Sequence, residues 1–211
     1  IRVLSKKYKL PVYITPGTLR SAGRILEKDM IRHFRAGEPV AIGDLSINAF
    51  QKEHDAADPH SFTISADGIH VGVFTDIGNC CNQVVTHFSR CHAAFLEANY
   101  CENMLMNGSY PYILKKRISS DNGHLSNTQA LDLFKNYRNS QLTHLILSHL
   151  SKNNNRPELV EELFTQQAGS TQIIVASRYE ETPVYCVKPT KTMQINPEIR
   201  MVPQQVQLSL F

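Results

Sequence analysis

Two histidines and one aspartate stand where apolar segments of the sequence end. The stretch SINAFQKEH ends at His54, VGVFTD ends at Asp76, and THLILSH ends at His149. In layered α/β sheets, loops at strand ends bring such distant residues together. Two imidazoles and a carboxylate form a sensible ligand set for zinc or manganese. Taken singly, each histidine is more typical of a hydrogen-bonded structural residue, and the spacing matches no compact metal motif.

The alternation of strand and helix patterns around these residues predicts a layered domain of the α/β or α+β class. Alternating apolar residues predict strands over 46–54 and 60–76, with Asp67 and Gly68 as a hairpin turn. The other expected elements are strands at 12–15, 93–99, 143–150, 172–179 and 183–187, and helices at 18–30, 81–91, 125–138 and 156–169.

The composition is that of an ordinary globular protein. The 211 residues are 42% hydrophobic and 19% charged, and the net charge of +3 permits an anionic partner without requiring one. No apolar run approaches the length of a membrane span, so we expect no membrane partner. The five cysteines include no C-x-x-C pair, which favours a reducing, cytoplasmic compartment.

A second group of polar residues lies in the string DNGHLSN. His124 precedes the predicted helix, whose start is marked by the capping-box spacing of Ser126 and Gln129. A helix start and the Ser126 hydroxyl favour a nearby anion, and His124 could protonate a leaving oxygen. The alternative is that residues 122–127 form only a turn and a helix cap.

Other residues are candidates for substrate contact. Asn99 follows the strand FLEA and either holds a phosphate, supports a metal-binding residue, or is a turn residue. The segment YPYILKKR carries Lys115, Lys116 and Arg117 beside two tyrosines. Basic groups interleaved with aromatic rings suit a nucleic-acid backbone and unstacked bases. A run of three charges is also typical of a solvated surface.

The last five residues, QLSLF, resemble the short motif by which bacterial repair and replication proteins bind the DNA polymerase sliding clamp. Gln207, Leu208, Ser209, Leu210 and Phe211 match its five positions. The leucines and the phenylalanine are apolar anchors, and a tail this short should bind with micromolar affinity, roughly −8 kcal/mol. The alternative is a final edge strand, because apolar and polar residues alternate from 205 to 210.

Several uncommon strings occur in order along the chain: KYKLPVYIT, EHDAADPHSFTI, VGVFTDIGN, FLEANY, RISSDNGHLSN and LILSHLSKNNN. Together they resemble the metallo-β-lactamase fold, and more narrowly the bacterial YycJ/WalJ group of that superfamily. The resemblance runs from about residue 1 to Gly169. It implies a four-layer αββα sandwich with two divalent metal ions, in which His54 and His149 are ligands and Asp76 bridges the ions. His124 and Asp76 would then be the catalytic residues.

The H-x-H-x-D-H motif of that superfamily is absent from the sequence. By the resemblance it lies just upstream of the segment RVLSKKYKLP. We therefore expect a sandwich that is truncated at its N-terminus and that is inactive or weakly metallated by itself. The expected organisation is this domain at 1–201, followed by a tail at 202–211 with the clamp motif.

The combined expectation is a metal-dependent phosphodiester hydrolase. The resemblance implies a DNA exonuclease that acts from the 5′ end in DNA repair, and the tail implies recruitment by the sliding clamp. Two alternatives are a hydrolase of small or cyclic phosphodiesters with the same fold, and a non-catalytic adaptor that binds the clamp.

Overall fold

The computed structural model describes residues 1–23 and 25–188. The expected tail at 202–211, its QLSLF motif and the domain boundary at residue 201 lie outside these residues. None of the helices in the described part combines the length and the apolar character that crossing a membrane requires.

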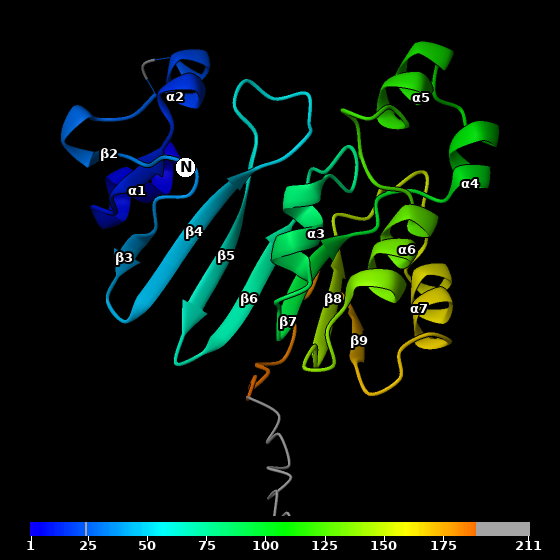
Figure 1. Cartoon of the computed structure of the whole chain (residues 1–211). Helices are drawn as coiled ribbons and strands as arrows, with labels where there is room; N and C mark the ends of the chain where they lie inside the picture. The colour runs from blue at the N-terminus through cyan, green and yellow to red at the C-terminus, as the bar shows by residue number, and fades with distance from the viewer. Residues whose placement is uncertain (24, 189–211) are drawn as a thin grey trace, which may run out of the picture.

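The first elements form a two-stranded sheet with helices beside it, drawn in blue in Figure 1. They are α1 (Arg2–Tyr8), β1 (Val12–Ile14), α2 (Pro16–Ala22), a 3-10 helix (Lys28–Met30) and β2 (Ile31–His33). β1 and β2 pair in parallel. α2 begins with Pro16 at its first position and with the Thr15 side chain accepting a hydrogen bond from the Thr18 amide at 3.2 Å. Both features favour a helix start.

Seven strands form one large mixed sheet, in the order β3-β4-β5-β6-β7-β8-β9. They are β3 (Val40–Ile42), β4 (Leu45–Gln51), β5 (His60–Ala66), β6 (Ile69–Phe74), β7 (Ala93–Glu97), β8 (His144–Ser148) and β9 (Gln172–Val175). Pairing is antiparallel from β3 to β6 and parallel from β6 to β9. Asp67 and Gly68 form the predicted turn between β5 and β6, with φ angles of 49° and 76° that suit a tight hairpin.

This topology brings the ends of four strands to one edge of the sheet. β4 and β6 run in the same direction because both are antiparallel to β5. β7 and β8 are in turn parallel to β6. The segments that follow β4, β6, β7 and β8 therefore leave the sheet at the same edge, the upper one in Figure 1.

Helices cover one face of the parallel half of the sheet (Figure 1). They are α3 (Asn82–Phe88), α6 (Asn127–Tyr137) and α7 (Pro157–Thr165). Phe74 of β6 is fully buried and packs edge-on against Phe88 of α3 at 5.5 Å between ring centroids. Phe134 of α6 and Phe164 of α7 pack at 5.8 Å. This aromatic core fixes the helices on the sheet and so fixes the loops at its edge.

The opposite face of the sheet is more open. Phe95 lies on the interior strand β7, opposite Val73 of β6, and is 39% exposed. Among the described residues, one large sheet with helices on one face is present, where the expected αββα sandwich has two large sheets.

Two predicted elements differ in the structure, and two short helices were not predicted. The helix expected over 18–30 is divided, because Gly23 ends α2 in a positive-φ conformation of 68°. The strand expected over 183–187 has no regular structure, pairs with no strand of the described sheet, and leaves Val184 fully exposed. Two short helices, α4 (Glu102–Asn107) and α5 (Tyr112–Ile118), were not predicted. Pro111 directly precedes α5 as its N-cap residue.

Candidate metal centre and active site

Two residues at the common edge have an unusual backbone conformation. Asp76 follows β6 with a φ of 54°, and His149 follows β8 with a φ of 59°. A left-handed conformation is uncommon for residues other than glycine and costs about 1–3 kcal/mol. Such strain is concentrated at functional sites, where the surrounding structure fixes it.

The three residues predicted from strand ends lie together at this edge. Asp76 Oδ1 lies 3.6 Å from His54 Nε2 and 3.5 Å from His149 Nε2. These distances exceed those of ordinary N–H···O hydrogen bonds. Two ligand atoms on one tetrahedral ion, with bonds of 2.0–2.2 Å, are separated by roughly 3.4 Å. The spacing therefore suits atoms that face a shared cation.

Both histidines use their other ring nitrogen to fix their orientation. His54 Nδ1 donates to the Gly123 carbonyl at 2.8 Å, and His149 Nδ1 donates to Glu97 Oε1 at 2.9 Å. In the neutral ring, these bonds leave Nε2 as the unprotonated nitrogen that faces Asp76. Histidines that bind metals typically show this arrangement.

Glu97, the last residue of β7, is a central residue that the sequence analysis missed. Its side chain is fully buried. Oε1 accepts hydrogen bonds from His124 Nδ1 at 2.6 Å and from His149 Nδ1 at 2.9 Å, and Oε2 accepts one from the Ile77 amide at 2.7 Å. Burial alone raises the pKa of Glu97, but these hydrogen bonds outweigh it and hold the pKa below its ordinary value. The carboxylate therefore stays charged. The sequence signal that could have identified Glu97 is its position as an acidic residue at the end of the apolar run AAFLE.

The charge of Glu97 affects its neighbours. The hydrogen bond to Glu97 raises the pKa of His149 against the opposing effect of burial. Lys52, one residue after β4, donates to the Thr75 carbonyl at 2.5 Å. Burial lowers the pKa of Lys52, while the charges of Asp76 and Glu97 partly oppose this effect. Lys52 thus supplies a positive charge beside the two carboxylates.

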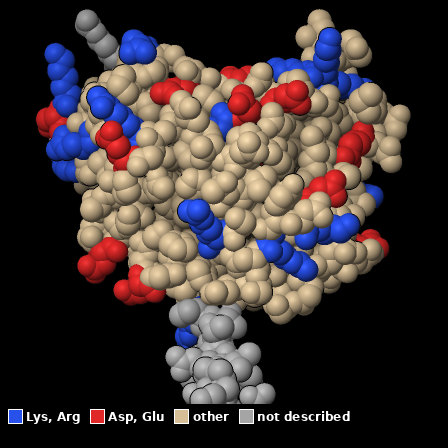
Figure 2. Space-filling model, viewed as in Figure 1, with Lys and Arg blue, Asp and Glu red and all other residues tan. Residues whose placement is uncertain are grey.

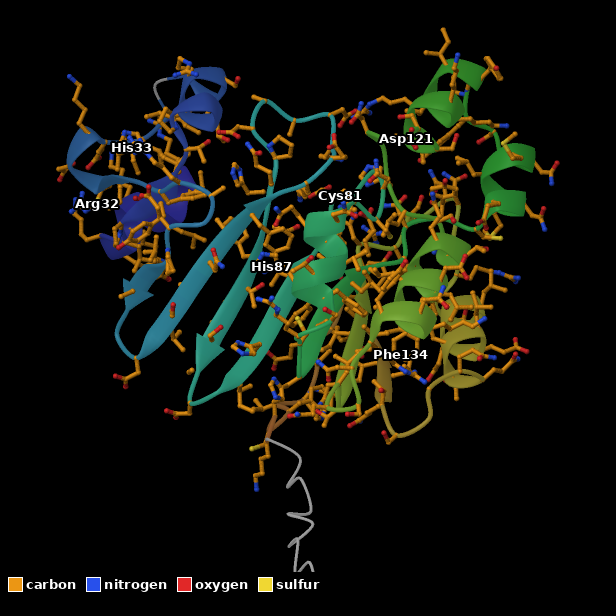
Figure 3. The ribbon with its side chains drawn as sticks, viewed as in Figure 1. Arg32, His33, Cys81, His87, Asp121 and Phe134 are labelled. Carbon is orange, nitrogen blue, oxygen red and sulfur yellow. The ribbon has the colours of Figure 1, made fainter. Side chains whose placement is uncertain are left out.

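The loop between α5 and α6 carries His124 into the centre. The Asp55 amide donates to the Asn122 carbonyl at 2.9 Å. Gly78 lies so close to the Asp121 carbonyl that any Cβ would overlap it. Asp121 is labelled in Figure 3, at the upper edge of the sheet. The segments after β4 and β6 therefore fix the position of this loop.

His124 lies beside both histidines of the strand-end group. Its ring centroid is 5.1 Å from that of His54 and 5.3 Å from that of His149. His54, Asp76 and His124 each offer one ligand atom within 4.8 Å of the others. With Nδ1 bonded to Glu97, the His124 ring is oriented as a proton donor or as a further ligand.

Asp55 adds another carboxylate to the centre. Its Oδ1 lies 3.5 Å from His54 Nε2, and its Oδ2 accepts a hydrogen bond from Arg117 Nε at 2.5 Å. The hydrogen bond from Arg117 holds the pKa of Asp55 below its ordinary value. Arg117 therefore joins α5 to the candidate metal centre.

Two predicted substrate contacts have structural partners. Asn99 is buried, and its side-chain Nδ2 donates to the His149 carbonyl at 2.8 Å. This hydrogen bond supports the strained backbone at His149. Ser126 is buried, and its hydroxyl accepts the Gln129 amide at 3.2 Å in the expected capping box. The structure thus places Ser126 as a helix cap whose oxygen already has a partner.

The three predicted basic residues all lie in the last turn of α5. Lys115 Nζ donates to the Met106 carbonyl at 2.7 Å, and Lys116 is exposed. Figure 2 shows blue side chains at the upper right, over α5. Of the three residues, only Arg117 bonds to the centre, through Asp55.

The donor set fits divalent cations. Two imidazoles with free Nε2 atoms face one carboxylate oxygen, and a second carboxylate and a third imidazole lie beside them. Such a mixture of nitrogen and oxygen ligands suits zinc or manganese. The residues that would hold the ions are His54, Asp76 and His149.

The sequence is similar to two curated exonucleases. It is 28% identical over 196 residues to the exodeoxyribonuclease YycJ of Bacillus anthracis, covering 92% of this chain and 74% of that protein. It is 27% identical over 179 residues to the exodeoxyribonuclease WalJ of Streptococcus pneumoniae, covering 82% of this chain and 66% of that protein. No family model matches the sequence.

Solved structures agree on the fold. The metallo-β-lactamase fold protein YhfI of Bacillus subtilis superposes with a TM-score of 0.61 at 14% identity, covering 83% of this chain and 66% of that one. Zinc-bound PqqB of Methylobacterium extorquens superposes with a TM-score of 0.59 at 16% identity, covering 82% and 65%.

The solved structures show that the chain has the metallo-β-lactamase fold. Among proteins of this fold, the chain is similar to the YycJ/WalJ exonucleases, as its sequence strings predicted.

Proposed function

We propose that the protein is a metal-dependent exodeoxyribonuclease. The observation that carries this proposal is the convergence of His54, Asp76 and His149 at 3.5–3.6 Å beside the hydrogen-bonded pair of Glu97 and His124. The similarity to two exodeoxyribonucleases supports DNA as the substrate. A cation site next to a hydrogen-bonded histidine suits phosphodiester hydrolysis.

In this proposal His54, Asp76 and His149 hold two divalent cations, zinc or manganese, together with ligands outside this set. When bound, such ions activate water and offset the negative charge that develops on the phosphate. Asp76 would hold the ions through its charged carboxylate, beside the two histidines. Lys52 and Asn99 keep Asp76 and His149 in their strained positions.

His124 is the proposed proton donor to the leaving oxygen. Glu97 accepts the Nδ1 proton at 2.6 Å, which orients the ring. When the ring carries a second proton on Nε2, that proton passes to the oxygen that leaves the phosphorus atom. Because Glu97 also bonds His149, one carboxylate sets the relative position of the proposed acid and a proposed ligand.

The remaining parts of the proposal concern the cellular role. Digestion from the 5′ end and a role in DNA repair rest on the resemblance to the YycJ/WalJ group. Recruitment by the sliding clamp rests on the five residues 207–211, which lie outside the described residues. A clamp-bound tail would raise the local concentration of the enzyme at replicating DNA.

The test is digestion of single- and double-stranded DNA, labelled at either end, by the intact protein with manganese or zinc. We expect shortening from the 5′ end that is lost in Asp76→Ala and kept in Asp44→Ala, an exposed aspartate outside the site. Hydrolysis of small diesters without digestion of DNA would point to a small-molecule phosphodiesterase. No hydrolysis with any metal, together with clamp binding, would point to an adaptor.

A further inference from the structure

A cavity of about 800 Å³ opens beside the metal centre. His124 and His149 are among its lining residues, so it reaches the proposed active site. Leu114 and Ile118 of α5 and Val175 at the end of β9 also line it. This volume is typical of small-molecule pockets. The cavity is therefore too small to enclose a duplex and suits one or a few nucleotide units.

The charged residues that line the cavity are basic. Arg117, Lys152 and Arg178 line it, and no acidic residue is among the described residues that do. Arg178 Nη2 donates to the Leu150 carbonyl at 2.5 Å, which places the guanidinium one residue from His149. A guanidinium has five N–H donors, so others stay available for a phosphate. Lys152 is exposed.

Two aromatic rings accompany these cations. Tyr179 is 79% exposed, and the Ser177 hydroxyl accepts its amide at 3.1 Å, which fixes the turn that carries the ring. The Tyr110 hydroxyl accepts a hydrogen bond from Asn153 Nδ2 at 3.1 Å. Both tyrosines line the cavity. Exposed aromatic rings beside cationic groups are the combination that binds single-stranded nucleic acids.

We propose that this cavity binds the single-stranded end of a nucleic acid and directs its scissile phosphate to the metal centre. Arg178 and Lys152 contact phosphates, and Tyr179 and Tyr110 stack on bases. The inference rests on the proposed function, because a phosphodiester-cleaving centre makes a nucleic-acid strand the natural ligand. It differs from the sequence expectation, since Lys115 and Lys116 do not line the cavity.

Binding of a fluorescent, phosphorothioate-protected DNA strand to the intact protein, measured by anisotropy over a range of salt concentrations, tests the inference. Arg178→Gln should reduce the slope of log affinity against log salt by about 0.7, and Arg178→Lys should restore it. Tyr179→Ala should weaken binding about 5- to 100-fold with the slope unchanged, while Tyr179→Phe restores affinity. Arg35→Gln and Tyr137→Ala, on exposed residues outside the cavity, are the matched controls.

A second readout separates strand binding from chemistry. The kcat/KM for a DNA strand, divided by that for bis(p-nitrophenyl) phosphate, should fall in Arg178→Gln and Tyr179→Ala by the same factor as the affinity. Equal losses for both substrates, or binding that neither variant changes, would overturn the inference. Equal affinity for RNA of the same sequence supports it, because phosphates and bases are common to both strands.

The two proposals fail in different ways. A wild-type protein that binds the strand through Arg178 and Tyr179 but hydrolyses nothing would refute the proposed function and leave the cavity assignment standing. If the protein digests DNA, and if Arg178→Gln and Tyr179→Ala bind the strand as tightly as the wild type, the cavity assignment is refuted and the proposed function stands.

Discussion

The buried carboxylate of Glu97 lies 2.6 Å from Nδ1 of His124. Its second hydrogen bond, to His149, makes the same oxygen the acceptor for two imidazoles. A charged group without access to water is retained where its partners stabilise the charge. Glu97 therefore determines the geometry of this site although it does not face the solvent.

Replacing Glu97 by glutamine keeps its size and removes its charge. We expect hydrolysis to fall about 10²- to 10⁴-fold, because His124 loses the charged acceptor that orients its ring for proton transfer. Metal affinity should fall about 10- to 100-fold, because His149 loses its carboxylate acceptor. Glu158→Gln, on the exposed start of α7, is the control. Wild-type turnover and metal content in Glu97→Gln would contradict the assignment.

Gly78→Ala tests whether the loop before α6 is held by close backbone contact. The new Cβ overlaps the Asp121 carbonyl, so the loop must move and take His124 with it. We expect a loss of about 1–3 kcal/mol in the free energy of unfolding, together with a large drop in kcat. Denaturant titration and steady-state kinetics measure the two effects. Asn79→Ala removes only a 3.4 Å side-chain contact to the same carbonyl and should behave as wild type.

Lys52→Met tests the role of positive charge beneath the centre. The variant leaves the Thr75 carbonyl without this donor and leaves Asp76 and Glu97 without a nearby cation. We expect it to lose about 1–3 kcal/mol of stability in the absence of metal. Saturating manganese should recover part of that loss, because the ion replaces the missing charge. Thermal denaturation with and without metal provides the measurement.

The control for this experiment is Lys135→Met, on the exposed surface of α6. An equal loss of stability with and without metal would assign Lys52 a packing role only.

Deletion of residues 207–211 tests the clamp motif. We expect hydrolysis of free oligonucleotides to persist and micromolar binding to the purified sliding clamp to disappear, as measured by surface plasmon resonance. Leu210→Ala with Phe211→Ala should match the deletion, since these residues are two of the three apolar anchors. A lower melting temperature in the deletion variant would instead favour the edge-strand interpretation.

The sequence predicted the meeting of His54, Asp76 and His149 because parallel strands share the edge at which they end. It also predicted the turn at Asp67 and the helix cap at Ser126, since both depend on residues close in sequence. These features follow from local pattern and from one rule of sheet topology.

Other features depend on contacts that no local pattern contains. In the sequence, Glu97 is an ordinary charged residue at the end of a strand. Its role is visible only in the structure, where it is buried and accepts hydrogen bonds from His124 and His149. Arg178 and Tyr179 fall within a segment predicted as strand, and only tertiary packing places them in the cavity. Lys115 lies in a basic, aromatic segment typical of nucleic-acid contacts, but its Nζ donates to the Met106 carbonyl instead.

The hydrogen bonds that build the centre join residues far apart in the chain. His54 and Gly123 are 69 residues apart in the sequence. The separation is 62 residues for Asp55 and Arg117, and 52 residues for Glu97 and His149. Contacts of this kind form slowly, since the entropy of closing long loops must be overcome before they contribute. The centre should therefore assemble late in folding, after the parallel strands have paired. A metal ion would then bind tightly only to the completed fold, which makes metal uptake a kinetic reporter of the last folding step.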